Sequence, residues 1–391
     1  MPTPGRHRSH VGPPTHPESC ATFRVERLLR SALRAGYAPS AVAAWSIGRQ
    51  PPVSVAVGAE SVRGDGQPVG PSSWYDLASL TKPLAAGSLF LVAMARGALA
   101  LETRLDHCLP EARGTPIGSC TLRHLLTHTS GLPAWAPVYA LAAGRRERTL
   151  PALLGIPLES AVGERVRYSC LGFLLLGPVL ERALDMPLGD AFELHVSGPS
   201  GLTAEIGYLP DTRRVRVAAG AVTSRVEETL TRDAGLDSGF LPERGSHLPD
   251  DGNARFLGGV AANAGLFGTA AGVVKLARRY LGGDRPFEPS MVGAAVRSWT
   301  PGLEQERGLA WQLAGTLGCS AGHWLSSSAF GHSGFTGTSV WVDPDQELTV
   351  ALLTNRLHPG ARQLDLHPLR RSLHRLLVAS DAPAEFTSST W

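Results

Sequence analysis

The sequence predicts an α+β fold, an α/β sandwich in which an antiparallel sheet takes strands from both chain ends and is flanked by helices. Five runs have strand character, two near the N-terminus and three near the C-terminus: 41–48, 53–58, 308–314, 337–342 and 347–354. The apolar residues between the two groups recur mainly at helical spacing. We therefore expect one unit over residues 22–380, with its sheet from about 40–60 and 305–356. A mostly helical region over about 84–300 would be inserted between the two parts of the sheet.

The N-terminal elements are a tail, a helix and a hairpin. Residues 1–21 are polar and rich in proline, so they bury too little apolar surface to become ordered. From Phe23 the apolar side chains recur at helical spacing with arginines between them, and Gly36 can end that helix. The pair Pro51-Pro52 separates the first two strands, which predicts a hairpin.

The central and C-terminal elements follow from caps and turns. Residues 79–99 predict a long apolar helix, in which Pro83 is tolerated because it falls in the first turn. A capping threonine or serine opens three of the four further helices, which span 121–128, 171–184, 269–280 and 290–299. A turn over 343–346 joins the last two strands, and a closing helix over 366–378 precedes a second tail at 381–391.

The charge balance excludes some classes of partner. The chain has 391 residues, with 37 Lys plus Arg against 34 Asp plus Glu, a net charge of +3. So small and evenly spread a charge argues against a nucleic-acid or membrane-surface partner. All but two of the basic residues are arginine, the exceptions being Lys82 and Lys275. Such a lysine is either incidental or stands where arginine cannot serve, because only the amine can lose its proton near neutral pH.

The cysteines and the N-terminus bear on the compartment. The 5 cysteines form no CxxC pair and are odd in number, so neither a disulfide framework nor a zinc knuckle is indicated. The N-terminus has no apolar signal-peptide core, and no apolar run approaches the roughly 20 residues that span a bilayer. We expect a soluble cytoplasmic protein, a monomer or small homo-oligomer; a periplasmic location stays open if the true start lies upstream.

The run Ser79-Leu80-Thr81-Lys82 fits the S-x-x-K element of acyl-transfer enzymes. One helical turn places Ser79 and Lys82 on the same face at the start of a helix. A serine hydroxyl is a poor nucleophile until a base takes its proton, and a buried lysine can share that task. The free N–H groups and positive dipole end of a helix start also suit an oxyanion. A short motif also occurs by chance, so an ordinary helix start is the alternative interpretation.

Other catalytic motifs are absent or incomplete in the sequence. No G-x-S-x-G occurs, which disfavours an α/β-hydrolase with a Ser-His-Asp triad. His124 and His128 lie four residues apart, but no Glu follows His124 as the zinc motif H-E-x-x-H requires. Neither lysine follows a glycine, and no complete G-x-G-x-x-G is present, so nucleotide sites are not expected. We expect no metal and no cofactor.

Five sequence blocks occur in an order that resembles one family of serine hydrolases. The blocks are DLASLTK at 76–82, LLTHTSGL at 125–132, YSCLGF at 168–173, GGVA and AGLFGT within 258–269, and GHSGFTGT at 331–338. They look like those of the hydrolases related to class C β-lactamases, D-alanyl-D-alanine carboxypeptidases and the corresponding esterases, over about residues 22–380. The resemblance implies a β-lactamase/transpeptidase-like fold and a covalent acyl-enzyme formed without metal or cofactor.

The resemblance also implies a role for each matched residue of the first two motifs. Ser79 matches the acylated nucleophile and Lys82 its partner, and Tyr168 matches the general base that also donates to the leaving group. Cys170 stands at the third position of the Y-x-N motif, where relatives carry Asn or Asp. A thiol is a weak hydrogen-bonding group, so a partner of the lysine and of the substrate amide is weakened.

The third motif lies at the end of the matched region. His332, Ser333 and Gly334 match the K-T-G block on a strand lining the site, and the N–H groups of Phe335 and Ser79 would form the oxyanion hole. His332 stands where β-lactamases carry a lysine, which removes a permanent cation that would anchor a substrate carboxylate. Hydrolysis of β-lactams therefore becomes less favoured than hydrolysis of esters or D-amino-acyl peptides.

These observations support two hypotheses for a protein acting on a small molecule or a peptide. The first is a serine hydrolase that forms an acyl-enzyme on an ester or a D-amino-acyl peptide or amide, with weak or no β-lactamase activity. The alternative is a catalytically impaired relative that binds a peptide or muropeptide without turnover. Cys170 motivates the alternative, because it weakens the second motif.

Overall fold

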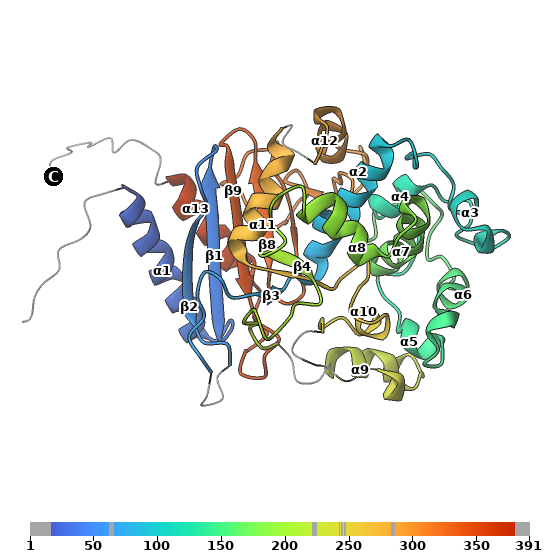
Figure 1. The fold of residues 1–391 in the computed structure, drawn as a ribbon, viewed down its shortest axis with the longest axis horizontal. Helices are drawn as coiled ribbons and strands as arrows, with labels where there is room; N and C mark the ends of the chain where they lie inside the picture. The colour runs from blue at the N-terminus through green and yellow to red at the C-terminus, as the bar shows by residue number, and fades with distance from the viewer. Residues whose placement is uncertain are drawn as a thin grey trace, which may run out of the picture.

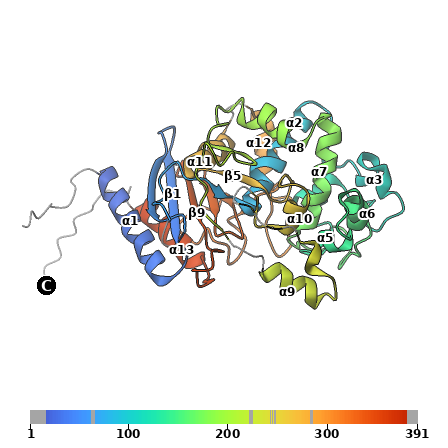
Figure 2. The same cartoon turned by 60° about the horizontal axis from the view of Figure 1, so that its bottom comes forward.

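The computed structural model describes residues 17–61, 66–220, 225–241, 243, 245, 248–282 and 286–379. It places a six-stranded antiparallel sheet beside a helical region, with helices packed on both faces of the sheet (Figure 1). Figure 2 shows the same side-by-side arrangement from a direction turned by 60°. The predicted α+β fold class is confirmed.

The large sheet joins the two ends of the chain. Its strand order is β2-β1-β9-β8-β7-β6. The bounds are β1 Ser40–Ile47, β2 Val53–Gly58, β6 Gln312–Leu313, β7 Phe330–Ser333, β8 Ser339–Asp343 and β9 Leu348–Thr354. Trp45 of β1 lies opposite Val53 of β2 and opposite Val350 of β9. N-terminal and C-terminal strands therefore share one sheet, as the strand pattern predicts.

Most of the regular elements between β2 and β6 are helices. The α-helices are α1 Pro17–Ala35, α2 Ser88–Ala95, α3 Leu105–Cys108, α4 Leu122–Leu126, α5 Val138–Leu141, α6 Thr149–Leu154, α7 Cys170–Leu184, α8 Leu188–Phe192, α9 Arg225–Asp233, α10 Gly252–Phe256, α11 Ala270–Ala277, α12 Pro289–Val296 and α13 His367–Ala379. Short 3₁₀ helices are η1 Ala78–Leu80, η3 Pro110–Ala112, η4 Arg146–Arg148, η6 Ser238–Phe240 and η7 Arg278–Leu281, and π-helical turns are η2 Lys82–Gly87 and η5 Glu193–Ser197.

The sheet separates two apolar cores. Successive side chains of a strand point to opposite faces, so alternate residues of β1 join different cores. Ala43 and Trp45 pack with α1 and α13 on the outer face. Val42 and Ala44 belong to the larger core, which includes α11 and the helical region. Strand β1 is thus buried on both faces, which explains its nearly continuous apolar sequence.

A second, three-stranded sheet supports the segment around Ser79. Its order is β3-β5-β4, with β3 at Tyr75–Asp76, β4 at Ile206–Tyr208 and β5 at Leu266–Gly268. Strands of two or three residues are too short to carry a period-two pattern, so the sequence did not predict them. This sheet brings residues near 76, 207 and 267 together just before the nucleophile motif.

The N-terminal helix is longer than its apolar periodicity predicts. Helix α1 begins at Pro17 rather than at Phe23, so residues 17–21 are helical and not part of the predicted tail. The added turn reaches the apolar core on the outer face of the sheet, which favours helix there. Residues 1–16 and the predicted tail at 381–391 lie outside the described residues.

Two other predicted elements are shorter or divided. The predicted helix 79–99 is the succession η1, η2 and α2, and it ends at Ala95. The stretch Ala78–Ala95 is apolar and long enough to cross a bilayer, but 83% of it is buried inside the protein, as a core helix would be. The predicted strand 308–314 shrinks to β6, because Ala310 has a φ of 64° and donates its N–H to the Leu126 carbonyl.

Candidate active site

A strained turn at the end of β3 presents the predicted nucleophile. Ala78, directly before Ser79, has a φ of 47°, a left-handed conformation that costs a non-glycine residue about 1–3 kcal/mol. The Ala78 N–H donates to Asp76 Oδ1 at 2.9 Å, and Thr81 Oγ1 donates to the Ala78 carbonyl at 2.6 Å. Bonds on both sides of Ala78 thus hold the turn, which leaves Ser79 partly exposed at the start of a helical segment.

Lys82 is fully buried and has a partner for each of its three N–H donors. Its Nζ donates to Ser79 Oγ at 3.0 Å and to the Asn263 carbonyl at 2.9 Å. The third contact is Cys170 Sγ at 3.4 Å, and sulfur is a weak acceptor. The S-x-x-K spacing therefore acts as predicted, because one helical turn brings the ammonium onto the serine hydroxyl.

Tyr168 approaches the same hydroxyl from the other side. Its OH donates to Ser79 Oγ at 2.7 Å. The ring packs on His128, with ring centres 4.6 Å apart, and on His332 at 5.9 Å. Ser169 caps α7 by accepting the Gly172 N–H, so Tyr168 is fixed by the helix start that follows it. Ser79 Oγ thus accepts two hydrogen bonds, from an ammonium and from a phenol.

The electrostatics of this cluster favour one cation. Burial lowers the pKa of Lys82, but attraction to Cys170 and Tyr168 raises it further, so the pKa lies above its ordinary value. Burial raises the pKa of the Tyr168 phenol and of the Cys170 thiol, and the Lys82 charge opposes both shifts. At neutral pH the favoured state is an ammonium beside a neutral phenol and a neutral thiol.

Hydrogen bonds join the segment after β7 to the residues that directly precede Ser79. Thr336 Oγ1 donates to the Asp76 carbonyl at 2.8 Å, and Thr338 Oγ1 donates to the Leu77 carbonyl at 3.1 Å. A Cβ at Gly334 would lie 2.7 Å from the Leu77 carbonyl oxygen, so only glycine permits this approach. The third motif therefore lies beside Ser79, as the resemblance implies.

Two backbone donors are free next to the nucleophile. Among the described residues the N–H groups of Ser79 and Phe335 have no acceptor. Phe335 follows the tight Gly334 contact, and its side chain is exposed. Ser333 ends β7 opposite Ser339 and is partly exposed. This arrangement can bind an oxyanion through the two N–H groups predicted for that role.

The two histidines against Tyr168 are neutral and have opposite tautomers. His332 Nδ1 lies 2.8 Å from the Ser333 carbonyl oxygen, so Nδ1 carries the proton and the buried Nε2 is an acceptor without a partner among the described residues. His128 Nδ1 accepts the Ser169 N–H at 3.0 Å, so its proton is on Nε2. Burial, with repulsion from Lys82 and Arg307, holds the pKa of both rings well below the usual range.

The sequence reasoning missed Arg307, which lies over the Tyr168 ring. Its guanidinium carbon is 6.0 Å from the ring centre, and the residue is 5% exposed. Nη2 donates to Gln305 Oε1, and Nε is buried without a partner among the described residues. Burial lowers the pKa of Arg307 to about 10, which still leaves it charged at neutral pH. No motif marks this residue within so arginine-rich a chain.

The sequence reasoning also missed Asn263 and Asp251, which support Lys82. Asn263 is fully buried, and its carbonyl accepts from Lys82 while its Nδ2 donates to Asp251 Oδ2 at 3.1 Å. Asp251 in turn caps α10, because its Oδ1 accepts the Ala254 N–H at 2.7 Å. The Asp251 charge also raises the pKa of Lys82, after the larger effects of Cys170 and Tyr168.

His124, one of the two histidines of the possible zinc motif, has a local structural role. His124 Nδ1 accepts the Thr121 N–H at 3.1 Å in a capping box at the start of α4.

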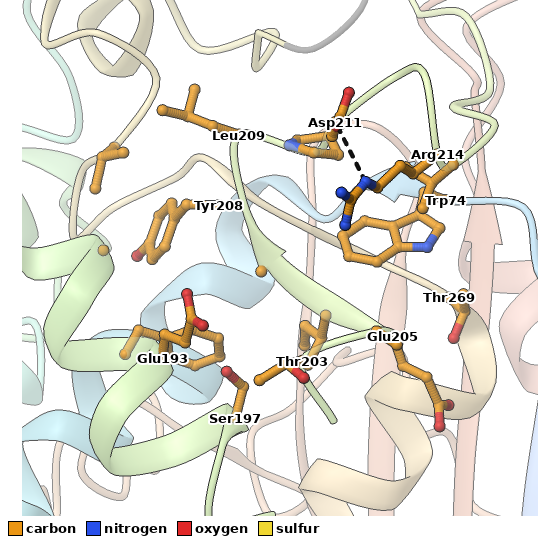
Figure 3. A pocket seen from close by; sticks show the side chains of 18 of the residues that line it. Trp74, Glu193, Ser197, Thr203, Glu205, Tyr208, Leu209, Asp211, Arg214 and Thr269 are labelled. Carbon is orange, nitrogen blue, oxygen red and sulfur yellow. Dashed lines mark ion pairs between the residues drawn. The ribbon is translucent and has the colours of Figure 1, made fainter. Parts of the chain in front are cut away.

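A cavity of about 1190 Å³ runs along β4 and beside α8 (Figure 3), but Ser79, Lys82 and Tyr168 do not line it. The figure shows Asp211 paired with Arg214 at its rim. Volume alone thus does not identify the reactive site.

Comparison with protein families and named proteins extends the resemblance. Residues 25–375 match the family described as Beta-lactamase. The chain is 28% identical over 308 residues to the "Putative D-alanyl-D-alanine carboxypeptidase" of Escherichia coli strain K12, which covers 73% of this chain and 69% of that protein. It is 30% identical over 323 residues to esterase EstB of Burkholderia gladioli, with 75% and 80% covered.

Comparison with solved structures supports the fold. EstCE1, a hydrolase with promiscuous acyltransferase activity, superposes with a TM-score of 0.69 at 21% identity and covers 92% of this chain and 98% of its own. A β-lactamase/D-alanine carboxypeptidase from Pseudomonas syringae gives 0.71 at 18% identity, with 93% and 99% covered. At such identities the likeness concerns the fold alone, and it agrees with the predicted architecture.

Proposed function

The chain belongs to the beta-lactamase family of serine hydrolases, and from this premise we propose that it cleaves an ester or a D-amino-acyl peptide or amide through an acyl-enzyme on Ser79. One observation carries the proposal: Ser79 Oγ accepts hydrogen bonds from both Lys82 Nζ, at 3.0 Å, and Tyr168 OH, at 2.7 Å. A serine is activated by an adjacent general base, and loss of one proton from the Lys82–Tyr168 pair leaves such a base within hydrogen-bonding distance of this hydroxyl.

Acylation begins when the Lys82–Tyr168 pair loses one proton. The Tyr168 phenolate, stabilised by the Lys82 ammonium, takes the Ser79 proton while Oγ forms a bond to the substrate carbonyl carbon. The N–H groups of Ser79 and Phe335 hold the oxyanion. Collapse of the tetrahedral intermediate breaks the bond to the leaving group, which receives the proton from Tyr168.

Deacylation repeats these steps with water as the nucleophile. Tyr168 takes a proton from water, the hydroxide oxygen attacks the acyl carbon, and Ser79 leaves with a proton returned from Tyr168. The water proton thus ends on Ser79, and the product is an acid. Lys82 stays charged throughout, held by the Asn263 carbonyl.

The third motif supports weak or no action on β-lactams. His332 is neutral, so the motif itself offers no permanent charge for a substrate carboxylate. The named relatives include an esterase and a protein named "Putative D-alanyl-D-alanine carboxypeptidase", which supports an ester or a D-amino-acyl bond for this chain.

A second candidate function rests on Cys170. Its Sγ is a weak acceptor 3.4 Å from Lys82 Nζ, where relatives carry an amide or carboxylate. Poor support of the lysine and of a substrate amide would leave a protein that binds a peptide or muropeptide without turnover.

Intact-protein mass spectrometry tests the proposal. Wild type, Ser79→Ala and Ser327→Ala are incubated briefly with p-nitrophenyl acetate or butyrate, a penicillin and a D-Ala-D-Ala ester. We expect an acyl mass increment in wild type and in Ser327→Ala, which loses only an exposed hydroxyl before β7, and none in Ser79→Ala. No increment with any compound would overturn the hydrolase proposal in favour of the binding protein.

A further inference from the structure

The buried charge at Arg307 has no counter-ion, and it faces the residue proposed to move the proton. Among the described residues no Asp or Glu oxygen lies within 4.0 Å of its guanidinium. A buried charge without a carboxylate partner destabilises a fold, and neutral side chains of similar size often stabilise it. Its presence therefore calls for a reason other than stability.

The surroundings of Arg307 indicate that reason. Its guanidinium carbon lies 6.0 Å from the centre of the Tyr168 ring. Burial lowers the pKa of Arg307, and the opposing effects come first from the ionised form of Tyr168 and then from that of Cys319. The histidine rings beside Tyr168, His128 and His332, are both neutral, so neither supplies a charge there.

We propose that Arg307 is a positioning residue of this site: it supplies, next to the Tyr168 ring, the permanent positive charge that His332 lacks, and so favours the phenolate form of Tyr168. The inference rests on the proposed function, in which that phenolate accepts the Ser79 proton. Arg307 acts through Tyr168 and touches no reacting atom.

The other charged and titratable groups around Tyr168 do not replace this charge. Lys82 lies on the Ser79 side of the ring, where its Nζ is already bonded to Ser79, the Asn263 carbonyl and Cys170. Cys170 is a neutral thiol at the start of α7. The negative charge of Asp251 raises the pKa of Lys82 and of Cys170, and the same charge would oppose the Tyr168 phenolate. Arg307 is therefore the second cation facing Tyr168.

The expected effect is a shift in a pH profile. An opposite charge about 4–6 Å away lowers the pKa of an acid by about one to three units, so loss of this charge should raise that of Tyr168 by about one. Acylation needs the phenolate, and its rate would then fall roughly tenfold at neutral pH and recover at higher pH.

The test measures the single-turnover acylation rate against pH in wild type, Arg307→Met and Arg307→Lys, with a neutral p-nitrophenyl ester. We expect the Met variant to shift the rising limb by about one pH unit towards alkaline values with little change in KM. The Lys variant, which keeps a charge, should stay close to wild type. Arg307→Gln is a second neutral variant in case the thioether packs badly.

A matched control comes from another buried arginine. Arg370 also lacks a carboxylate within 4.0 Å among the described residues, and its Nη2 donates to the Thr338 carbonyl rather than facing Tyr168. Arg370→Met removes the same kind of buried charge at a place that does not face Tyr168, so it should not move the pH limb. We expect Arg307→Met to unfold at a temperature no lower than wild type, because it removes an unpaired buried charge.

Four outcomes would overturn the inference. An unchanged profile in both neutral variants, or a loss equal at every pH, would assign Arg307 a structural role. A rise in KM confined to carboxylate-bearing substrates would make it a substrate anchor. A wild-type protein that forms no acyl-enzyme would overturn the proposed function and this inference together, whereas normal acylation with an unshifted profile would overturn only the inference.

Discussion

Two polar regions of the molecule differ in how their side chains use their hydrogen-bonding capacity. In the cluster at Ser79, Lys82 and Tyr168 both donate to one hydroxyl. In the cavity of about 1190 Å³ along β4, the polar groups serve local structure: Thr269 caps α11 and Asp211 pairs with exposed arginines. From this contrast we expect the chemistry at the hydroxyl on which two donors converge rather than in the cavity.

The largest expected effect follows replacement of the buried ammonium. Lys82→Arg should slow acylation about 10³-fold, because the bulkier guanidinium cannot take the place of the ammonium that donates to Ser79 and stabilises the Tyr168 phenolate. Stopped-flow release of p-nitrophenol measures the rate, and the thermal midpoint checks the fold. A decrease of less than about tenfold would contradict the expectation that the chemistry occurs in the Ser79 cluster, because acylation would then not depend on Lys82.

The second effect is a change of pH dependence. The pKa values of Lys82 and Tyr168 both lie above their ordinary values, so the deprotonated pair is scarce at neutral pH and grows as pH rises. Below those pKa values we expect the acylation rate to rise about tenfold per pH unit, since one proton is lost. Tyr168→Phe should lower the rate about 10²-fold and flatten the profile. A rate that falls with increasing pH would contradict this assignment.

A third, smaller effect sharpens the view of Cys170. Cys170→Asn offers an amide oxygen in place of the weak sulfur acceptor 3.4 Å from Lys82 Nζ. We expect acylation of a D-amino-acyl substrate to accelerate up to about tenfold, about the worth of one hydrogen bond to a charged group. Cys170→Ala is the control and should not accelerate the reaction. Equal acylation rates in all three proteins would show that the Cys170 thiol does not impair the reaction.

The smallest effect is expected in the cavity. Arg214 is exposed, and its pairing with Asp211 at 3.5 Å is a surface contact of little energetic value. Arg214→Gln should change the acylation rate less than about twofold and leave the thermal midpoint nearly unchanged. A loss of acylation rate as large as that expected for Lys82→Arg would place the reactive site in the cavity instead of the Ser79 cluster.

Features that depend on near neighbours and on repeated patterns could be predicted from the amino-acid sequence. Strand character at both chain ends predicted the shared sheet, in which β1 pairs with β9. Three residues of helical spacing were enough to bring Lys82 onto Ser79, because one turn of helix has the same geometry in any fold. The motif order added Tyr168, Cys170 and the segment after β7, which the structure brings to the same site.

Only the tertiary structure decided what surrounds these groups. Arg307 faces Tyr168, and Asn263 holds Lys82, through contacts between segments far apart in the chain that no local periodicity encodes. The strained φ of Ala78 and the opposite tautomers of His128 and His332 depend on hydrogen bonds made after packing. Burial then sets which of the clustered acids and bases keeps its charge, because desolvation and neighbouring charges exist only in the folded protein.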